Sequence, residues 1–258
     1  MTLSEQTVLV TGAAGAVGCA VCQHIDKAGG RLIAVDSDIT KLDPLTAETI
    51  LAKGGLVHQL DVADEKAWPD LAGALKPIDG LVTCAAVIDV AASPGEPCRS
   101  AWDHTISTTL TGVWLACEAA IFHMLAHGRG GSIVNVGSVV ARLGSATSQP
   151  AYTSAKGGVL ALSRELAVAN AAEGIRVNVV SPGLLDTDLT RGLIASDEEL
   201  GRRLTHIPLG RLGLPGDVAA MVAWLLSAEA NYITGADIPI DGGLSAAFVT
   251  GREAGQPR

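Results

Sequence analysis

Short apolar, β-branched runs alternate along the chain with longer stretches of helical periodicity. The short runs predict strands at Thr7–Val10, Arg31–Val35, Leu56–Leu60, Ile78–Thr83, Ser132–Val136, Arg176–Val180 and Asp237–Ile240. The longer stretches predict helices at Ala16–Ala28, Pro44–Lys53, Asp64–Leu75, Ser100–Ala126, Tyr152–Ala172 and Pro215–Ser227. The segment Asp186–Leu209 has a looser pattern, and we expect it to be mobile.

Strands that alternate with helices at this spacing indicate an α/β fold. Right-handed crossovers between parallel strands give a doubly wound, Rossmann-type sheet with helices on both faces. Ligands of such sheets bind at the carboxyl ends of the strands, where the strand order reverses. No repeat or shift in composition divides the 258 residues, so we expect one domain, 1–258.

Composition agrees with this fold and narrows the partners. Only 3% of the residues are aromatic, so the core must be built from Ala, Val, Leu and Ile, which suits strands buried on both faces. A net charge of −9 disfavours a nucleic-acid partner. No apolar run approaches the roughly 20 residues that cross a bilayer, and Met1–Glu5 lacks the features of a signal peptide. We therefore expect a cytoplasmic protein with no membrane partner.

Two pairs of possible metal ligands are weak candidates. Cys19 and Cys22 form a C-x-x-C, but they fall inside a predicted helix and no second Cys/His pair has ligand spacing. His123 and His127 stand near a helix end, where we expect solvated histidines. The sequence therefore predicts no metal site and reduced, mostly buried cysteines.

A glycine-rich loop follows the first predicted strand and opens the first helix. Gly12, Gly15 and Gly18 let the chain turn tightly and bring backbone N–H groups close to a pyrophosphate at the helix N-terminus. Such glycines also occur in purely structural turns. Asp36 ends the second strand, 18 residues after Gly18, where a carboxylate can accept hydrogen bonds from the adenosine ribose.

Asp36 favours NAD over NADP as the cofactor, because its charge would face the 2′-phosphate of NADP. No Arg or Lys occupies this loop, Asp36-Ser-Asp38, to attract that phosphate. The alternative reading of this loop-forming string is a solvated turn.

At Tyr152-Thr-Ser-Ala-Lys156 the sequence resembles the short-chain dehydrogenase/reductases, in their single-domain branch of about this length. Tyr-x-x-x-Lys alone is common by chance. The resemblance extends over nearly the whole chain, through Thr11–Gly18, Asp36, Leu60–Val62, Gly131–Ser138, Asn178–Gly183, Thr187, Tyr232–Gly235 and Asp241–Gly243.

The resemblance implies a seven-stranded parallel sheet and hydride transfer between a nicotinamide and a carbinol or carbonyl carbon. It also implies a homo-oligomer, a tetramer or dimer paired through the long helices, and a substrate lid at Asp186–Leu209. The residues that it places around NAD are Gly12, Gly15, Ala16, Val17, Gly18, Asp36, Asp61, Val62, Cys84, Ala85, Ala86, Tyr152, Lys156, Pro182, Gly183, Leu185 and Thr187.

Ser138, Tyr152 and Lys156 suit the implied reaction. Tyr152 and Lys156 are four residues apart on a helix and so share one face. A free tyrosine has a pKa of about 10, and a neighbouring ammonium and the positive nicotinamide both favour the phenolate. Tyr152 can then accept the alcohol proton or donate it, while Ser138 hydrogen-bonds the substrate oxygen. Singly, each could be an ordinary surface residue.

Three positions depart from the family pattern. Thr109 stands where the family usually has an asparagine that supports a proton-relay water, so Thr109 is the fourth candidate catalytic residue. The usual Asn-Asn-Ala-Gly reads Thr83-Cys-Ala-Ala86, which removes amide donors from the cofactor wall. Ala16 stands where the single-domain branch usually has a glycine.

Three functions fit these features. The leading one is a secondary-alcohol dehydrogenase or carbonyl reductase. Its substrate would be alicyclic or otherwise apolar if the lid stripe of Leu189, Leu193, Ile194, Leu200, Leu204 and Ile207 faces the pocket rather than packs inside. A 3-oxoacyl-[acyl-carrier-protein] reductase shares the motifs, although Asp36 argues against it. A non-catalytic NAD-binding regulator would explain the departures.

Overall fold

The computed structural model describes residues 2–74, 77–88, 97–145, 147–194 and 196–246, and their strands form one sheet. The sheet has seven strands in the order β3-β2-β1-β4-β5-β6-β7, and every neighbouring pair is parallel. The strands are β1 (Thr7–Thr11), β2 (Arg31–Asp36), β3 (Leu56–Gln59), β4 (Gly80–Thr83), β5 (Gly131–Val136), β6 (Ile175–Pro182) and β7 (Asp237–Ile240). The predicted doubly wound fold is confirmed.

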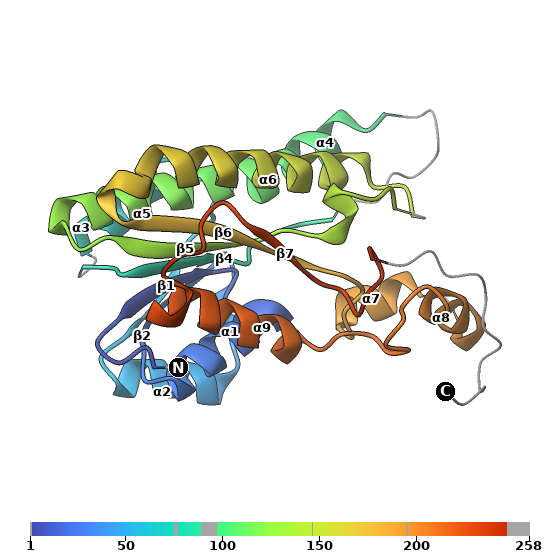
Figure 1. The fold of residues 1–258 in the computed structure, drawn as a ribbon, viewed down its shortest axis with the longest axis horizontal. Coiled ribbons are helices and arrows are strands. Elements are labelled where there is room, and N and C mark those ends of the chain that lie inside the picture. The colour runs from blue at the N-terminus through green and yellow to red at the C-terminus, as the bar shows by residue number, and fades with distance from the viewer. Residues whose placement is uncertain (1, 75–76, 89–96, 146, 195, 247–258) are drawn as a thin grey trace.

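Helices cover both faces of the sheet (Figure 1). One face carries α3 (Ala67–Ala74), α4 (Arg99–Ile106), α5 (Gly112–His127) and α6 (Pro150–Asn170), and the other carries α1 (Ala16–Lys27), α2 (Pro44–Ala52) and α9 (Pro215–Leu226). Two short helices, α7 (Asp188–Leu193) and α8 (Asp197–Leu204), lie beyond one end of the sheet.

The inner strands β1, β4, β5 and β6 read as mostly apolar runs because both of their faces are buried. All five residues of β1 are buried, with Val8 and Val10 in the core beneath α1 and α9, and Leu9 in the core beneath α5. This alternation follows from the period of two in a strand. The sequence pattern therefore located all seven strands, with ends within a few residues.

Two helical predictions need correction, and the segment with the looser pattern also contains helices. The helix predicted from Asp64 begins only at Ala67, because Asp64 makes a turn in which its carboxylate accepts the Lys66 N–H at 3.0 Å. Its predicted end at Leu75 and the tail 247–258 lie outside the described residues. The long helix predicted over Ser100–Ala126 is not regular, because a π-helical segment, Ser107–Thr111, separates α4 from α5. The segment Asp186–Leu209 contains α7 and α8.

The continuous helix Arg99–His127 also corrects the expectation that no stretch approaches membrane-spanning length. Its 29 residues are long and apolar enough to cross a membrane, but 50% of its most apolar window is buried inside the protein. Half-burial of this kind is typical of a helix that packs on a core. His123 on this helix is buried rather than solvated, with its ring stacked 6.4 Å from that of His127.

The five cysteines are free, and Cys22 and Cys117 are fully buried. Among the described residues, no group of three His, Cys, Asp or Glu side chains could hold a metal ion.

Candidate active site

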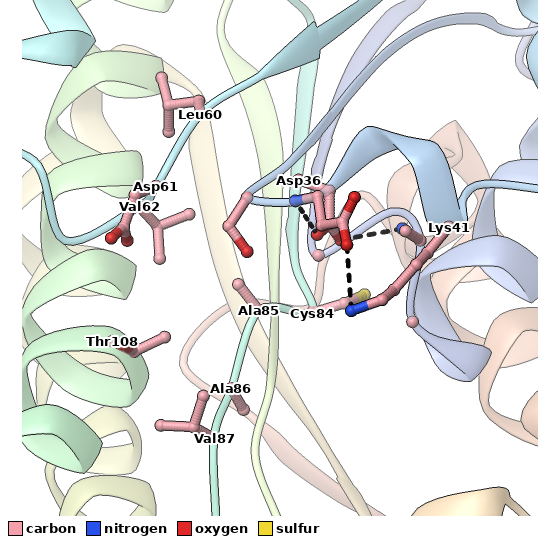
Figure 2. A pocket seen from close by; sticks show the side chains of 15 residues that line it. Asp36, Lys41, Leu60, Asp61, Val62, Cys84, Ala85, Ala86, Val87 and Thr108 are labelled. Atoms are coloured by element: carbon pink, nitrogen blue, oxygen red, sulfur yellow. Dashed lines mark hydrogen bonds and ion pairs between the residues drawn. The ribbon is translucent and has the colours of Figure 1, made fainter.

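A cavity opens at the carboxyl ends of β1, β2 and β4, where the strand order reverses (Figure 2). Its volume is about 280 Å³, close to the small end of the roughly 300–1,000 Å³ that ligand pockets span. It is lined by Gly12, Ala14, Gly15, Asp36, Ser37, Asp38, Lys41, Leu60, Asp61, Val62, Cys84, Ala85, Ala86, Val87 and Thr108. Eight of the predicted cofactor residues are in this lining.

The glycine loop is shaped by contacts that admit no side chain. Gly12 has φ +64°, and a Cβ there would stand 2.5 Å from the Ala85 nitrogen. A Cβ on Gly18 would overlap the Gly12 carbonyl oxygen. The first turn of α1 has neither a side-chain cap nor an acidic residue, so it fits an anionic group such as a pyrophosphate. Ala16 and Val17 begin this helix and do not line the cavity.

Asp36 is held from two sides. One carboxylate oxygen accepts the N–H of Ala14 in the glycine loop, and the other accepts the N–H of Asp38, both at 3.0 Å. A carboxylate has about four acceptor positions, so it can still accept hydroxyl groups of a ligand. Asp36 therefore fits the ribose-binding role predicted for it.

We expected no Arg or Lys near the loop that follows Asp36, but Lys41 lies there. It lies on the 3₁₀ turn Ile39–Lys41, lines the same cavity as Asp36, and pairs with Asp38 at 3.0 Å (Figure 2). Lys41 was not predicted to lie at the cavity, because no periodicity marks a three-residue turn. Asp38, with Thr40 two residues later, was the available signal, since an aspartate often caps such turns.

Next to the cavity, Thr83 turns away from the cofactor wall into a buried network. Its hydroxyl donates to Asn135 Oδ1 at 2.8 Å, and Asn135 Nδ2 donates to Ser163 Oγ at 2.9 Å. This chain joins β4 and β5 to α6. Cys84 remains on the cavity wall, where burial raises the pKa of its thiol to about 12. Thr83, which stands where the family usually has an asparagine, therefore helps to connect β4 with β5 and α6.

The structure brings Ser138, Tyr152 and Lys156 together. Lys156 is 1% exposed, its Nζ lies 5.6 Å from the centre of the Tyr152 ring, and it donates to the Val136 carbonyl at 2.6 Å. Ser138 follows β5 two residues after Val136 and hydrogen-bonds the Tyr152 phenol.

The proton affinities in this cluster follow burial. Burial lowers the pKa of Lys156 to about 8, and the Cys84 thiol acts weakly against this. Burial raises the pKa of Tyr152 to about 12, while the hydrogen bond from Ser138 lowers it. The lysine was expected to favour the phenolate, but burial dominates the pKa of Tyr152 and raises it instead. A buried lysine without a carboxylate partner among the described residues is a frequent feature of functional sites.

Thr109 is occupied with the backbone. It is fully buried in the π-helical segment, where its hydroxyl accepts the Val87 N–H at 3.1 Å and donates to the Val87 carbonyl at 3.3 Å. These two bonds fix the chain that follows the cofactor wall. They also use the one hydrogen that Thr109 could offer to a relay water.

The predicted nicotinamide-side residues follow β6, outside the cavity that Asp36 lines. Pro182 ends β6, and Gly183 donates to the Ile240 carbonyl at 3.0 Å. Leu185 is buried, and Thr187 caps α7 by accepting the Thr190 N–H at 3.3 Å. In the segment Asp186–Leu209, Ile207 is buried whereas Leu189 is 57% exposed, so the predicted apolar stripe is not one continuous face.

Known proteins resemble this chain over almost its full length. A family profile described as enoyl-(acyl carrier protein) reductase matches residues 12–245. L-rhamnose 1-dehydrogenase (NAD(P)(+)) from Azotobacter vinelandii is 36% identical over 253 residues, which are 95% of this chain and 98% of the relative. The cis-4-hydroxycyclohexanecarboxylate dehydrogenase of Sinomonas cyclohexanicum is 36% identical over 247 residues, covering 94% of this chain and 98% of the relative.

A solved structure shares the fold. An Agrobacterium tumefaciens protein with bound NADP has a TM-score of 0.86 and 32% identity, covering 95% of this chain and 98% of that one.

Proposed function

This chain belongs to the short-chain dehydrogenase/reductase family of oxidoreductases that act on alcohols, and we propose that it transfers a hydride between NAD and a secondary alcohol or its ketone. The observation that carries this proposal is the buried Lys156 beside Tyr152 and Ser138, behind a cavity with a glycine loop and Asp36.

Each catalytic side chain has a defined task in this proposal. Tyr152 accepts the alcohol proton during oxidation and donates it during reduction. Lys156 holds a positive charge next to the phenol, and Ser138 donates to the substrate oxygen as charge develops there. Bound NAD supplies the acceptor for the hydride. The Cys84–Ala86 wall and the glycine loop hold the dinucleotide in place and exclude water.

NAD is the cofactor that Asp36 supports best, because a carboxylate fixed by Ala14 and Asp38 repels a 2′-phosphate. The substrate we propose is an alicyclic or otherwise apolar secondary alcohol. Leu143 follows Ser138 and is 39% exposed, and Leu189 follows Thr187, so apolar side chains stand on both segments that border the reaction end.

A Tyr152→Phe variant tests the mechanism, with Tyr232→Phe as its control because Tyr232 is 100% exposed. Both lose one hydroxyl. We expect Tyr152→Phe to lower kcat for NADH formation from a panel of cyclic and linear secondary alcohols by about 10²–10⁴-fold. NADH binding, followed by calorimetry, should weaken at most about tenfold in Tyr152→Phe, which loses one hydrogen bond to the cofactor, and should stay unchanged in Tyr232→Phe. Equal turnover in the two variants would exclude Tyr152 as the acid/base.

A second candidate function is reduction of 3-oxoacyl groups on an acyl carrier protein, favoured by the 3-oxoacyl-[acyl-carrier-protein] reductase of Chlamydia pneumoniae, which is 42% identical over 144 residues, 56% of this chain. A 3-oxoacyl thioester reduced faster than any of the ketones that correspond to the alcohols of the panel would establish it. The Thr109 and Thr83–Ala86 departures would suit a non-catalytic regulator that binds NAD. That reading requires tight NAD binding with no turnover on any substrate.

We also propose that the protein is a homo-oligomer assembled through α5 and α6. Large apolar side chains are exposed on these helices, with Phe122 at 68%, Leu125 at 46% and Val168 at 81%. An exposed apolar face of this kind marks a contact surface. Sedimentation should give a dimer or tetramer, and Phe122→Glu together with Val168→Glu should shift it toward the monomer.

A further inference from the structure

We infer that the Asp38–Lys41 ion pair sets how strongly this pocket prefers NAD over NADP. This inference rests on the proposed function, since it needs a dinucleotide in the cavity. The described residues of the lining include three carboxylates, Asp36, Asp38 and Asp61, and one cation, Lys41. Among these residues, a 2′-phosphate that enters the cavity therefore has a single positive partner, which Asp38 already holds.

The turn that presents Lys41 is built around the Asp38 carboxylate. Oδ1 of Asp38 accepts the Thr40 N–H at 3.2 Å and the Thr40 hydroxyl at 2.5 Å, which leaves Oδ2 for Lys41 Nζ at 3.0 Å. These contacts keep the pKa of Asp38 below its ordinary value, so the carboxylate stays ionised at neutral pH. The Lys41 side chain is 76% exposed and free to move toward a ligand.

Asp36 and the ion pair are coupled through the backbone, because the Asp38 N–H donates to Asp36 Oδ1 at 3.0 Å. A ribose held by Asp36 would present its 2′-substituent to the same turn. With NAD the substituent is a hydroxyl, and the Asp38–Lys41 pair remains intact. With NADP the phosphate must repel Asp38 and also compete with it for the Lys41 ammonium, so one carboxylate opposes NADP in two ways.

Two substitutions separate these effects. Asp38→Asn keeps an oxygen to accept the Thr40 N–H but removes the charge that repels phosphate and holds Lys41. We expect it to raise NADP affinity about fivefold and to change NAD affinity less than about twofold. Lys41→Met should lower NADP affinity about fivefold, again with little effect on NAD. Asp103→Asn and Lys53→Met make the same charge changes in exposed ion pairs that do not line the cavity.

The measurement is the ratio of the NADP and NAD dissociation constants, obtained by calorimetry at low salt for the whole protein and all four variants. A ratio at least about tenfold lower in Asp38→Asn than in Lys41→Met, with both controls near the unaltered protein, supports the inference. If Asp38→Asn and Lys41→Met both bind NAD but their ratios differ by less than this, the inference is overturned and the proposed function stays in place. The same holds if the ratios of the two control variants differ from each other by as much. An unaltered protein that binds neither dinucleotide overturns the proposed function, and the inference with it.

Discussion

The two ends of the site use charge in opposite ways. At the adenosine end, Asp38 and Lys41 are paired and their side chains are 40% and 76% exposed, so water screens each of them. At the reaction end, Lys156 is 1% exposed and is paired with a carbonyl oxygen. Because water screens the Asp38–Lys41 pair, its effect on cofactor specificity is small. Desolvation of Lys156, in contrast, changes its proton affinity by orders of magnitude.

The largest effect that would test this contrast is the pH dependence of the reaction. In the mechanism we propose, oxidation needs Tyr152 ionised and Lys156 protonated, and burial places their pKa values at about 12 and about 8. Below a pH of about 8 the phenolate fraction, and with it the oxidation rate, rises about tenfold per pH unit. Above it, the loss of charge on Lys156 offsets this gain and the rate levels off. Reduction should be flat below about 8 and fall above it.

A profile of kcat/KM in both directions measures this. In Lys156→Arg the cation does not deprotonate, so the rise in oxidation should continue beyond a pH of about 8. An unaltered protein whose oxidation rate climbs steadily to a pH of about 10 would contradict the assignment of the break to Lys156.

The buried network beside the reaction end offers the next largest effect. Asn135→Leu leaves the Thr83 hydroxyl buried without its acceptor, so the free energy of unfolding should fall by about 2–3 kcal/mol. Adding Thr83→Val should recover part of the loss, because both polar partners are then gone. Asn170→Ala, which breaks one half-buried bond to the Leu166 carbonyl, is the control and should cost less than about 1 kcal/mol. Urea denaturation gives all three values, and additive losses would argue against the network.

At the adenosine end, the glycine loop provides a matched pair. Gly12→Ala places a Cβ at positive φ and 2.5 Å from the Ala85 nitrogen, so we expect a loss of about 2 kcal/mol of stability. Gly15→Ala has its nearest contact at 3.3 Å from the Gly12 oxygen, and its φ is −71°. That substitution should change stability by less than about 0.5 kcal/mol. Equal melting temperatures for the two variants would show that the loop relaxes around Gly12.

Salt should produce the smallest effect and separate the two ends directly. Between about 0.05 and 0.5 M salt, we expect the NADP dissociation constant to fall a few-fold, because salt screens the repulsion between the 2′-phosphate and the exposed Asp38 carboxylate. The pH break of the reaction should move by less than about 0.3 units, since Lys156 is buried. A break that shifts as strongly as the NADP affinity would mean that solvent reaches Lys156.

The sequence predicted those parts of the molecule that depend on local pattern. The strands were found because each has apolar residues on both faces, and the glycine loop and Asp36 were found because their spacing is tied to one strand–turn–helix unit. Lys41 was missed because a three-residue turn has no periodicity, and only the Asp38 cap brings it to the cavity. The direction of the Tyr152 pKa was missed because burial is a property of the assembled core, which the four-residue spacing to Lys156 does not describe.

The irregular segment Ser107–Thr111 has a consequence for how insertions and deletions act in this chain. A π-helical turn contains one residue more than an α-helical turn. Deleting one residue there would convert the segment to α-helix and leave the side chains from Gly112 to His127 on the same faces relative to Arg99–Ile106. Deleting one residue within Gly112–His127 instead would turn every later side chain of α5 by about 100° and bring its exposed face inward. The two hydrogen bonds between the Thr109 hydroxyl and the Val87 backbone fix the position of this π-helical segment.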